Sequence, residues 1–108
     1  MIKKISIVTP TFNEELNIEK LCVDISLQMK KLDYDYEHIV IDNLSTDTTI
    51  QILEKIAGKD KNLKVIVNSR NFGHIRSPIH GLLQASGDAV ILMSADFQDP
   101  VDLIPKYI

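Results

Sequence analysis

Oxygen-bearing side chains follow an apolar run near the end of the sequence. Residues 89–93 are apolar, and the segment after them carries Asp96, Gln98 and Asp99. The Gly-Asp pair before the run is a turn signal, so the run has the form of a buried strand that leads into a polar segment. Carboxylate and amide oxygens are ligands that divalent cations prefer. The pattern therefore indicates a ligand or metal site beyond the end of this strand.

Two earlier segments combine an apolar run with a polar continuation in the same way. Residues 4–9 lead into TPTFNEE, and residues 37–42 lead into DNLSTD. In open parallel sheets, ligands bind in the crevice beyond the carboxyl ends of the strands. If the three strands are neighbours, their polar segments meet at one edge of the sheet and share a site.

The carboxylates of this edge suit a sugar nucleotide in two separate ways. Asp42 could accept hydrogen bonds from the base or the ribose, while Asp96 and Gln98 could hold Mg²⁺ or Mn²⁺ near the diphosphate. The cation would neutralise charge that builds up on a departing diphosphate. Arg70, in the basic loop 70–76, could add a cationic contact to phosphate.

Structural interpretations of the same residues stay open. Side chains that could bind a ligand could instead cap helices, because Ser, Thr, Asp and Asn satisfy free N–H groups at helix starts. The loop acid Asp96 and the basic loop around Arg70 could simply be solvated. The candidate caps are Thr11 paired with Glu14, Asn13 as an alternative to Thr11, Ser45, Asp47, and Asp99 before Pro100.

Hydrophobic periodicity predicts strands and helices in strict alternation. Crossovers of a dozen or more residues separate the strands, as parallel strands require and hairpins do not. We therefore expect one α/β domain over residues 1–108, a three-layer α/β/α fold around a wound, mostly parallel sheet. The predicted strands are 4–9, 37–42, 64–67 and 89–93, and the predicted helices begin at 11–15, after 43–47, at 77–78 and at 99–100, with Leu32, Gly58 and Gly87 ending the first three.

Composition narrows the range of partners. The net charge of −3 and the pI near 5.5 argue against a nucleic-acid binder, which needs Lys and Arg in excess. No apolar run approaches the roughly 20 residues of a membrane span, so we expect a soluble segment. Cys22, alone, excludes an internal disulfide and fits a cytoplasmic protein. We expect Cys22 to be a core residue, and His38 and His80 to be structural.

Four segments together resemble family 2 inverting glycosyltransferases with the GT-A fold. The resemblance is to their N-terminal, donor-binding part, and most closely to the dolichol-phosphate mannosyltransferase and bactoprenol glucosyltransferase branch. It runs along essentially the whole chain, in the order of the family. The segments are 6–17 (SIVTPTFNEELN), 39–48 (IVIDNLSTDT), 70–73 (RNFG) and 87–105 (GDAVILMSADFQDPVDLIP).

The resemblance implies roles for particular residues. The nucleotide pocket of such enzymes uses a Pro, an aromatic residue and a Glu after the first strand and an acid after the second. The second acid of a D-x-D motif and a Gln two residues later hold the metal. By position, the nucleotide-sugar residues are Pro10, Phe12, Glu14, Asp42, Asn43, Arg70, Ser94 and Asp96, and the metal ligands are Asp96 and Gln98.

Two positions depart from the pattern of the family. Asn43 replaces the second of two paired acids, but an amide can still bond a ribose hydroxyl. Ser94 replaces the first acid of D-x-D, and a hydroxyl is a poorer ligand for a divalent cation than a carboxylate. Ser94 therefore keeps open an alternative, a degenerate nucleotide-binding module without catalysis.

The resemblance also predicts what the parent enzyme does. We expect transfer of a sugar from a UDP- or GDP-linked donor to a lipid phosphate or a cell-surface glycan, with inversion. The general base and the acceptor-binding half should lie beyond Ile108, so this part alone should transfer sugar poorly. Any membrane association should come from those downstream segments, at the inner face of the cell membrane.

Two other enzyme classes are less consistent with the sequence. A sugar nucleotidyltransferase would need a Gly-rich, basic first loop to hold a triphosphate, and TPTFNEE is neither. A dinucleotide-dependent oxidoreductase would need G-x-G-x-x-G after the first strand, and this motif is absent.

Overall fold

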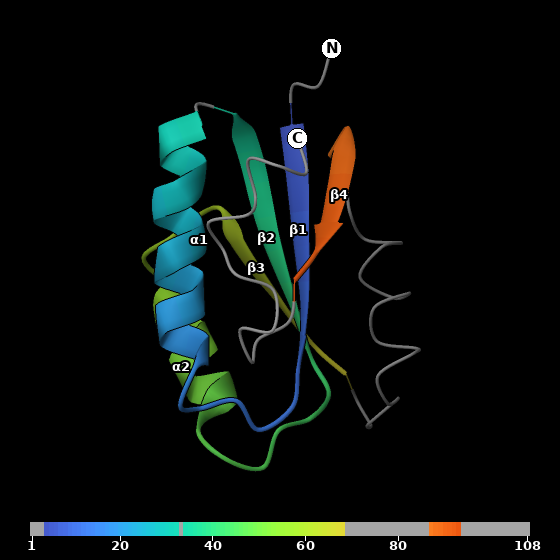
Figure 1. Ribbon diagram of the computed structural model, residues 1–108. Helices are drawn as coiled ribbons and strands as arrows, with labels where there is room; N and C mark the ends of the chain where they lie inside the picture. The colour runs from blue at the N-terminus through green and yellow to red at the C-terminus, as the bar shows by residue number, and fades with distance from the viewer. Residues whose placement is uncertain (1–3, 33, 69–86, 94–108) are drawn as a thin grey trace.

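A computed structural model describes residues 4–32, 34–68 and 87–93. In this part of the chain the elements alternate as expected (Figure 1). They are β1 (Lys4–Thr11), α1 (Ile18–Leu32), β2 (Asp35–Asp42), α2 (Thr49–Ala57), β3 (Leu63–Val67) and β4 (Ala89–Leu92). The helices predicted from 77 and from 99 lie outside the described residues.

The described strands form one parallel sheet in the order β3-β2-β1-β4. The chain steps outward from β1 to β2 and β3, then returns to the other side of β1. This order confirms that the first, second and fourth strands are neighbours. It also places the topological switch point, where ligands bind in open α/β sheets, between β1 and β4.

The first strand continues two residues past its predicted end, because Pro10 does not interrupt it. The backbone groups of Val8 point toward β4, since its carbonyl accepts a hydrogen bond from the N–H of Met93. Those of Thr11 point toward β2, since its carbonyl accepts from the N–H of Asn43. The backbone nitrogen of Pro10, two residues after Val8, therefore points toward β4 at a level where the described pairing with β4 has already ended. Because proline has no N–H, it can stand in a strand only where no neighbouring strand needs that donor. In the described part of the sheet, no hydrogen bond between strands is lost at Pro10.

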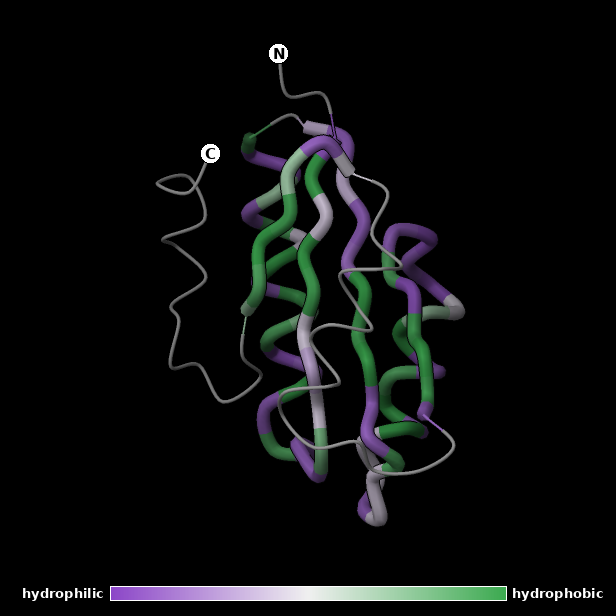
Figure 2. The backbone as a smooth tube through the Cα atoms, turned by 90° about the vertical axis from the view of Figure 1, so that its right-hand side faces the viewer, coloured by the Kyte–Doolittle hydropathy of each residue, from purple (hydrophilic) through white to green (hydrophobic). Residues whose placement is uncertain are grey.

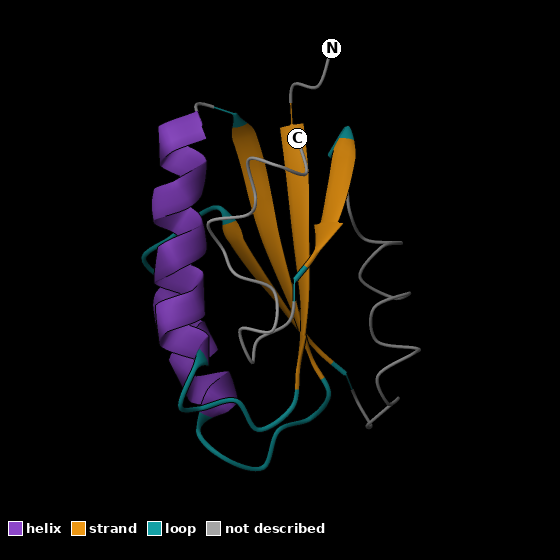
Figure 3. Ribbon diagram, in the orientation of Figure 1, coloured by secondary structure: helices purple, strands orange, loops and turns teal. Residues whose placement is uncertain are grey.

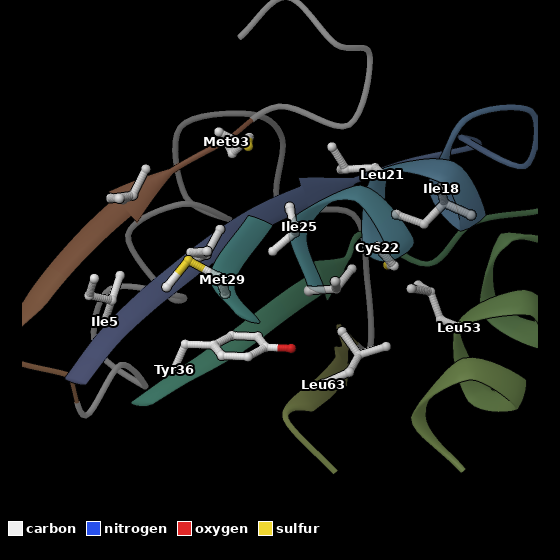
Figure 4. Packing of buried hydrophobic residues seen from close by; sticks show 13 residues of the cluster. Ile5, Ile18, Leu21, Cys22, Ile25, Met29, Tyr36, Leu53, Leu63 and Met93 are labelled. Carbon is white, nitrogen blue, oxygen red and sulfur yellow. The ribbon is translucent and has the colours of Figure 1, made fainter. Parts of the chain in front are cut away.

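The two described helices cover the same face of the sheet (Figures 1 and 3). The apolar stripe of α1 packs on the sheet, and α2 adds Leu53, which is fully buried. Figure 4 shows Ile5, Met29 and Met93 among the side chains of this layer. The cluster extends from β3 to β4 and contains Ile5, Ile7, Ile18, Leu21, Cys22, Ile25, Met29, Tyr36, Val40, Leu53, Leu63, Ile91 and Met93.

The opposite face of the sheet carries a second, smaller apolar cluster. Val8, Ile39 and Ile41 are buried there. Since strand side chains alternate between faces, the central strands are apolar on both sides, which is typical of a parallel sheet with two covered faces. Figure 2 shows hydrophobic residues running through the strands.

The start of α1 differs from the prediction. Neither Thr11 nor Asn13 caps it, because Thr11 is still in β1 and the side chain of Asn13 bonds to another loop. The first turn instead forms on the carbonyl of Glu14, which accepts hydrogen bonds from the N–H groups of Asn17 and Ile18. The capping-box interpretation of Thr11 and Glu14 is therefore wrong, since the strand takes the residue that the cap would need.

A buried polar contact joins the strands at the other end of the sheet. Ser6 donates its hydroxyl proton to Glu37 over 2.5 Å, and Lys64 donates to the same carboxylate over 2.6 Å. The N–H of Gly87 donates to the Ser6 hydroxyl oxygen over 2.8 Å. Glu37 is only 2% exposed, so its charge is held by partners from neighbouring strands. The contact attaches the start of β4 to β1.

In the residues that the structure describes, no helix is both long enough and apolar enough to cross a lipid bilayer.

Candidate functional site

The candidate site lies at the edge of the sheet where β1 and β2 end. The loop after β1 (residues 12–17) and the loop after β2 (residues 43–48) run side by side there (Figure 3). Both follow strands that are paired to their last residues, Thr11 and Asp42. The edge is next to the switch point between β1 and β4, so two of the three predicted polar segments do meet.

Asn13 is the residue that joins the two loops. Its side-chain oxygen accepts hydrogen bonds from the N–H groups of Thr46, over 2.8 Å, and Asp47, over 3.3 Å. Its own N–H donates to the hydroxyl of Ser45 over 2.9 Å. Asn13 has a left-handed φ of 53°, which asparagine tolerates better than most residues. Sequence reasoning treated it only as a helix cap and missed this role.

Asp42 organises the second loop from inside. Its Oδ1 accepts protons from the hydroxyls of Thr11, over 2.8 Å, and Ser45, over 2.5 Å. Its Oδ2 accepts from the N–H of Ser45 over 2.7 Å. The residue is fully buried, so its contacts are with the protein itself. A carboxylate has about four acceptor sites, and three of those of Asp42 are used within the protein.

Asn43 continues this inner layer. It is 3% exposed, and its side-chain oxygen accepts a hydrogen bond over 2.7 Å from the amide of Asn68, which follows β3. The N–H of Asn68 in turn donates to the carbonyl of Asp42. The amide of Asn43 therefore connects the ends of β2 and β3, an additional function to the ribose contact implied by the resemblance.

Carboxylates of both loops stabilise the start of α2. Asp47 accepts from the N–H and the hydroxyl of Thr49, the first residue of α2. The N-cap itself is Thr48, without a side-chain cap hydrogen bond, so the prediction that Asp47 is the cap is wrong by one residue. Burial acts to raise the pKa of the Asp47 carboxyl, but hydrogen bonds from Thr49 and Glu15 outweigh it and hold the pKa below its usual value. Glu15 reaches from the first loop and accepts from the N–H and hydroxyl of Thr48. Ser45, by contrast, links loops and caps no described helix.

Three other predicted site residues stand at the end of β1. Pro10 is half-buried in the strand, and Phe12 is 40% exposed just after it. Glu14 is half-buried; its N–H donates to the hydroxyl of Thr49, and its carboxylate has no partner among the described residues. Within the described part of the chain, the ring of Phe12 is thus exposed and the carboxylate of Glu14 makes no hydrogen bond or ion pair.

The predicted metal ligands belong to the segment after β4. Asp96 and Gln98, like Arg70 and Ser94, lie outside the described residues. Within residues 4–32, 34–68 and 87–93, no three or more His, Cys, Asp or Glu side chains form a group that could hold a metal ion. Asp42 is not such a ligand, because its carboxylate already accepts three hydrogen bonds.

His38 and Cys22 are structural, as expected. His38 is buried in β2, where its Nε2 lies 2.9 Å from the hydroxyl of Thr9, and burial lowers its pKa to about 4. Burial, with a smaller effect of Asp60, raises the pKa of the Cys22 thiol to about 12. A thiol that stays protonated is a poor nucleophile, so neither residue belongs to the site.

Residues 6–108 match the model of the family described as Glycosyl transferase family 2. The chain is 35% identical over 108 residues to an undecaprenyl-phosphate 4-deoxy-4-formamido-L-arabinose transferase of Proteus mirabilis. That alignment covers 99% of this chain and 33% of the relative. The chain therefore spans about a third of the length of this relative.

Solved structures are similar over most of the chain. One is a mannosyltransferase from Pyrobaculum calidifontis in complex with GDP-Man and Mn²⁺, with a TM-score of 0.75, 27% identity and coverage of 85% of this chain and 27% of that one. Another is residues 1–349 of TarS from S. aureus in complex with UDP-GlcNAc, with a TM-score of 0.74, 35% identity and coverage of 86% and 26%. Both contain a nucleotide sugar.

Proposed function

Since this chain belongs to glycosyltransferase family 2, we propose that it binds the nucleotide-sugar donor of a glycosyltransferase at the edge formed by the β1 and β2 loops. The observation that carries the proposal is the connection of these loops through Asn13 beside the switch point of the sheet. Hydrogen bonds hold both loops in place before a ligand arrives. Such preorganisation lowers the entropic cost of binding.

In this proposal, different residues of the edge contact the base, the ribose and the phosphates of the donor. Phe12 offers an aromatic face to the base, and the carboxylate of Glu14, which has no partner among the described residues, offers an acceptor to ribose hydroxyls. Asp42 belongs to the same donor set and keeps the pocket in shape through its hydrogen bonds to Thr11 and Ser45. Asn43, Pro10, Ser94 and Arg70 complete the proposed donor set, the last of these as a cationic contact to phosphate.

We assign the metal to Asp96 and Gln98, whose oxygens suit Mg²⁺ or Mn²⁺. The solved mannosyltransferase that is similar to this chain is in complex with Mn²⁺. When bound, a divalent cation supplies positive charge beside the leaving diphosphate. In this chain, Asp96 and Gln98 would orient it, while Phe12 and Glu14 hold the nucleoside.

The parent enzyme is proposed to invert the configuration of the sugar. A base outside this chain takes a proton from the acceptor, whose oxygen then attacks the anomeric carbon opposite the diphosphate. On this proposal residues 1–108 are one donor-binding domain and the acceptor site is contributed from elsewhere. The relative from Proteus mirabilis is named for transfer to undecaprenyl phosphate, so we propose a lipid-phosphate acceptor before a glycan. Reaction with such a lipid would occur at the cytoplasmic face of the membrane.

Titration with nucleotides tests the donor site. Calorimetry of the purified chain with UDP and with GDP, each with and without Mn²⁺, should give saturable binding of one of them, tightened by the metal. Phe12→Ala should weaken that binding about tenfold, because a stacked base is lost. Leu27→Ala, on the exposed side of α1, is the matched control and should bind as the parent chain does.

Two results would contradict the proposal. If neither nucleotide binds with or without metal, the chain is better explained as a degenerate module, the alternative that Ser94 supports. If Phe12→Ala and Leu27→Ala bind equally well, the nucleoside does not lie at the end of β1.

A further inference from the structure

Leu44 has a backbone conformation that its side chain disfavours. Its φ is 62°, in the left-handed region, where a residue with a branched side chain is uncommon. Among the described non-glycine residues, only Asn13 shares a positive φ, and its polar side chain makes hydrogen bonds that compensate. Leu44 has no polar side-chain atom to do so. The reason for a leucine at this point must therefore lie elsewhere.

The residues on both sides hold Leu44 in this conformation. Before it, Asn43 is buried and bonded to Asn68 over 2.7 Å. After it, the N–H of Ser45 donates to the carboxylate of Asp42 over 2.7 Å, which closes the turn around Leu44. Strain of this kind persists only where the surroundings enforce it, and it is concentrated at functional sites.

The same contacts place Leu44 beside the proposed donor pocket. Ser45, its neighbour, accepts a hydrogen bond over 2.9 Å from the N–H of Asn13, which directly follows Phe12. Phe12 and Leu44 thus each directly precede one of the two residues, Asn13 and Ser45, whose hydrogen bond joins the loops. Leu44 is 45% exposed and Phe12 is 40% exposed, so both present apolar surface at this edge. Neither side chain belongs to the apolar clusters that the described residues form.

We propose that Leu44 is a specificity-determining residue that forms an apolar wall for the base of the donor nucleotide, next to Phe12. This inference rests on the proposed function. A flat base has apolar faces and a polar rim, which matches two exposed apolar side chains in loops that also carry the carboxylate of Glu14. The strained backbone turns the Leu44 side chain out of the fold so that it meets the ligand.

Two substitutions of Leu44 separate its backbone from its side chain. Leu44→Gly removes the side chain and relieves the left-handed strain, while Leu44→Ala removes most of the side chain and keeps the strain. UDP, GDP and pyrophosphate are titrated into each variant with Mn²⁺, and the midpoint of urea unfolding is measured alongside. Leu27→Ala, which shortens an exposed leucine on α1 outside both loops, is the matched control.

We expect both Leu44 variants to bind the preferred nucleoside diphosphate about five- to tenfold more weakly, as loss of an apolar contact predicts. Pyrophosphate, which has no base, should bind them as it binds the parent chain. Leu44→Gly should unfold at a higher urea concentration than the parent, although it binds less well. Leu27→Ala should change none of these values.

The outcomes that overturn the inference are distinct from those that overturn the donor site. Unchanged nucleotide affinity in both Leu44 variants, with saturable binding by the parent, removes Leu44 from the pocket and leaves the donor site intact. An equal loss for pyrophosphate means that Leu44 only shapes the loop. A lower unfolding midpoint in Leu44→Gly means that its side chain packs in the fold. No binding of either nucleotide by the parent overturns both proposals.

Discussion

Gly87 lies where the turn before β4 touches the backbone of β1. A Cβ at this position would lie 2.6 Å from the Ser6 hydroxyl oxygen and 2.7 Å from the Ser6 nitrogen. The second of these atoms is backbone in a central strand and cannot move aside. Glycine is therefore required here for close approach, and the hydrogen bond from its N–H to Ser6 depends on that approach.

Gly87→Ala should lower the free energy of unfolding by about 1–3 kcal/mol, the usual cost of overpacking. Gly58→Ala is the control, because the nearest atom to its added Cβ is 3.5 Å away and its φ is −65°. It should leave stability unchanged or raise it by about 0.5–1 kcal/mol. Urea unfolding followed by circular dichroism measures both, and equal stability of the two variants would contradict the close approach.

At the scale of elements, the loops after β1 and β2 behave as one unit. Asn13 accepts from the backbone of the second loop, and Glu15 accepts from the N–H and hydroxyl of Thr48 just before α2. The first residues of α2 thus depend on a carboxylate from a loop more than thirty positions earlier, since Glu15 and Thr48 are separated by 33 residues. A change in either loop should therefore affect the other.

Asn13 variants can separate its two contributions. Asn13→Ala loses the hydrogen bonds and keeps a Cβ at a left-handed φ, so stability should fall by about 1–3 kcal/mol. Asn13→Gly also loses the bonds but accepts the φ, and should recover about 1 kcal/mol of that loss. Both should weaken nucleotide binding, measured by calorimetry. If Asn13→Gly is as stable as the parent chain, the hydrogen bonds contribute little.

At the scale of the whole molecule, burial of a neutral histidine links folding to pH. The pKa of His38 is lowered from 6.5 to about 4 by burial between the sheet and the helical layer. Between these values the unfolded chain binds a proton that the folded chain does not, so stability falls as the pH falls. Above pH 6.5 both states are neutral and the effect of His38 is fully favourable.

Unfolding free energy should therefore decrease by about 1.4 kcal/mol per pH unit within this window, and by about 3 kcal/mol in total. His38→Gln, which cannot titrate, should be less stable at neutral pH but should lose this slope. The carboxyl of Asp47, whose pKa is lowered, makes the free energy of unfolding depend on pH mainly below pH 3.8, its usual pKa. It therefore does not interfere with the slope caused by His38 above pH 4.5. Urea unfolding at pH 4.5, 5.5 and 7 measures the slope, and an unchanged slope in His38→Gln would exclude His38 as its origin.

Much of the architecture is already determined by the sequence. Apolar runs of period two and stripes of period 3.6 set which segments are strands and helices, because burial of one face or both depends on local spacing. Long crossovers then require parallel strands. Polar segments after three strands also located the candidate edge, since ligands bind where such strands end.

Only the tertiary structure decided what the residues at that edge bind within the protein. Thr11 and Glu14 have capping-box spacing, yet Thr11 continues β1 because pairing with Asp42 extends the strand. Leu44 carries no local sign that it takes a left-handed φ, and Asn43 before it is held by a hydrogen bond from Asn68, 25 positions away. Asn13 takes its left-handed φ where its N–H donates to Ser45, 32 positions away. Spacing along the chain reports local geometry, whereas these contacts join residues that only the sheet order brings together.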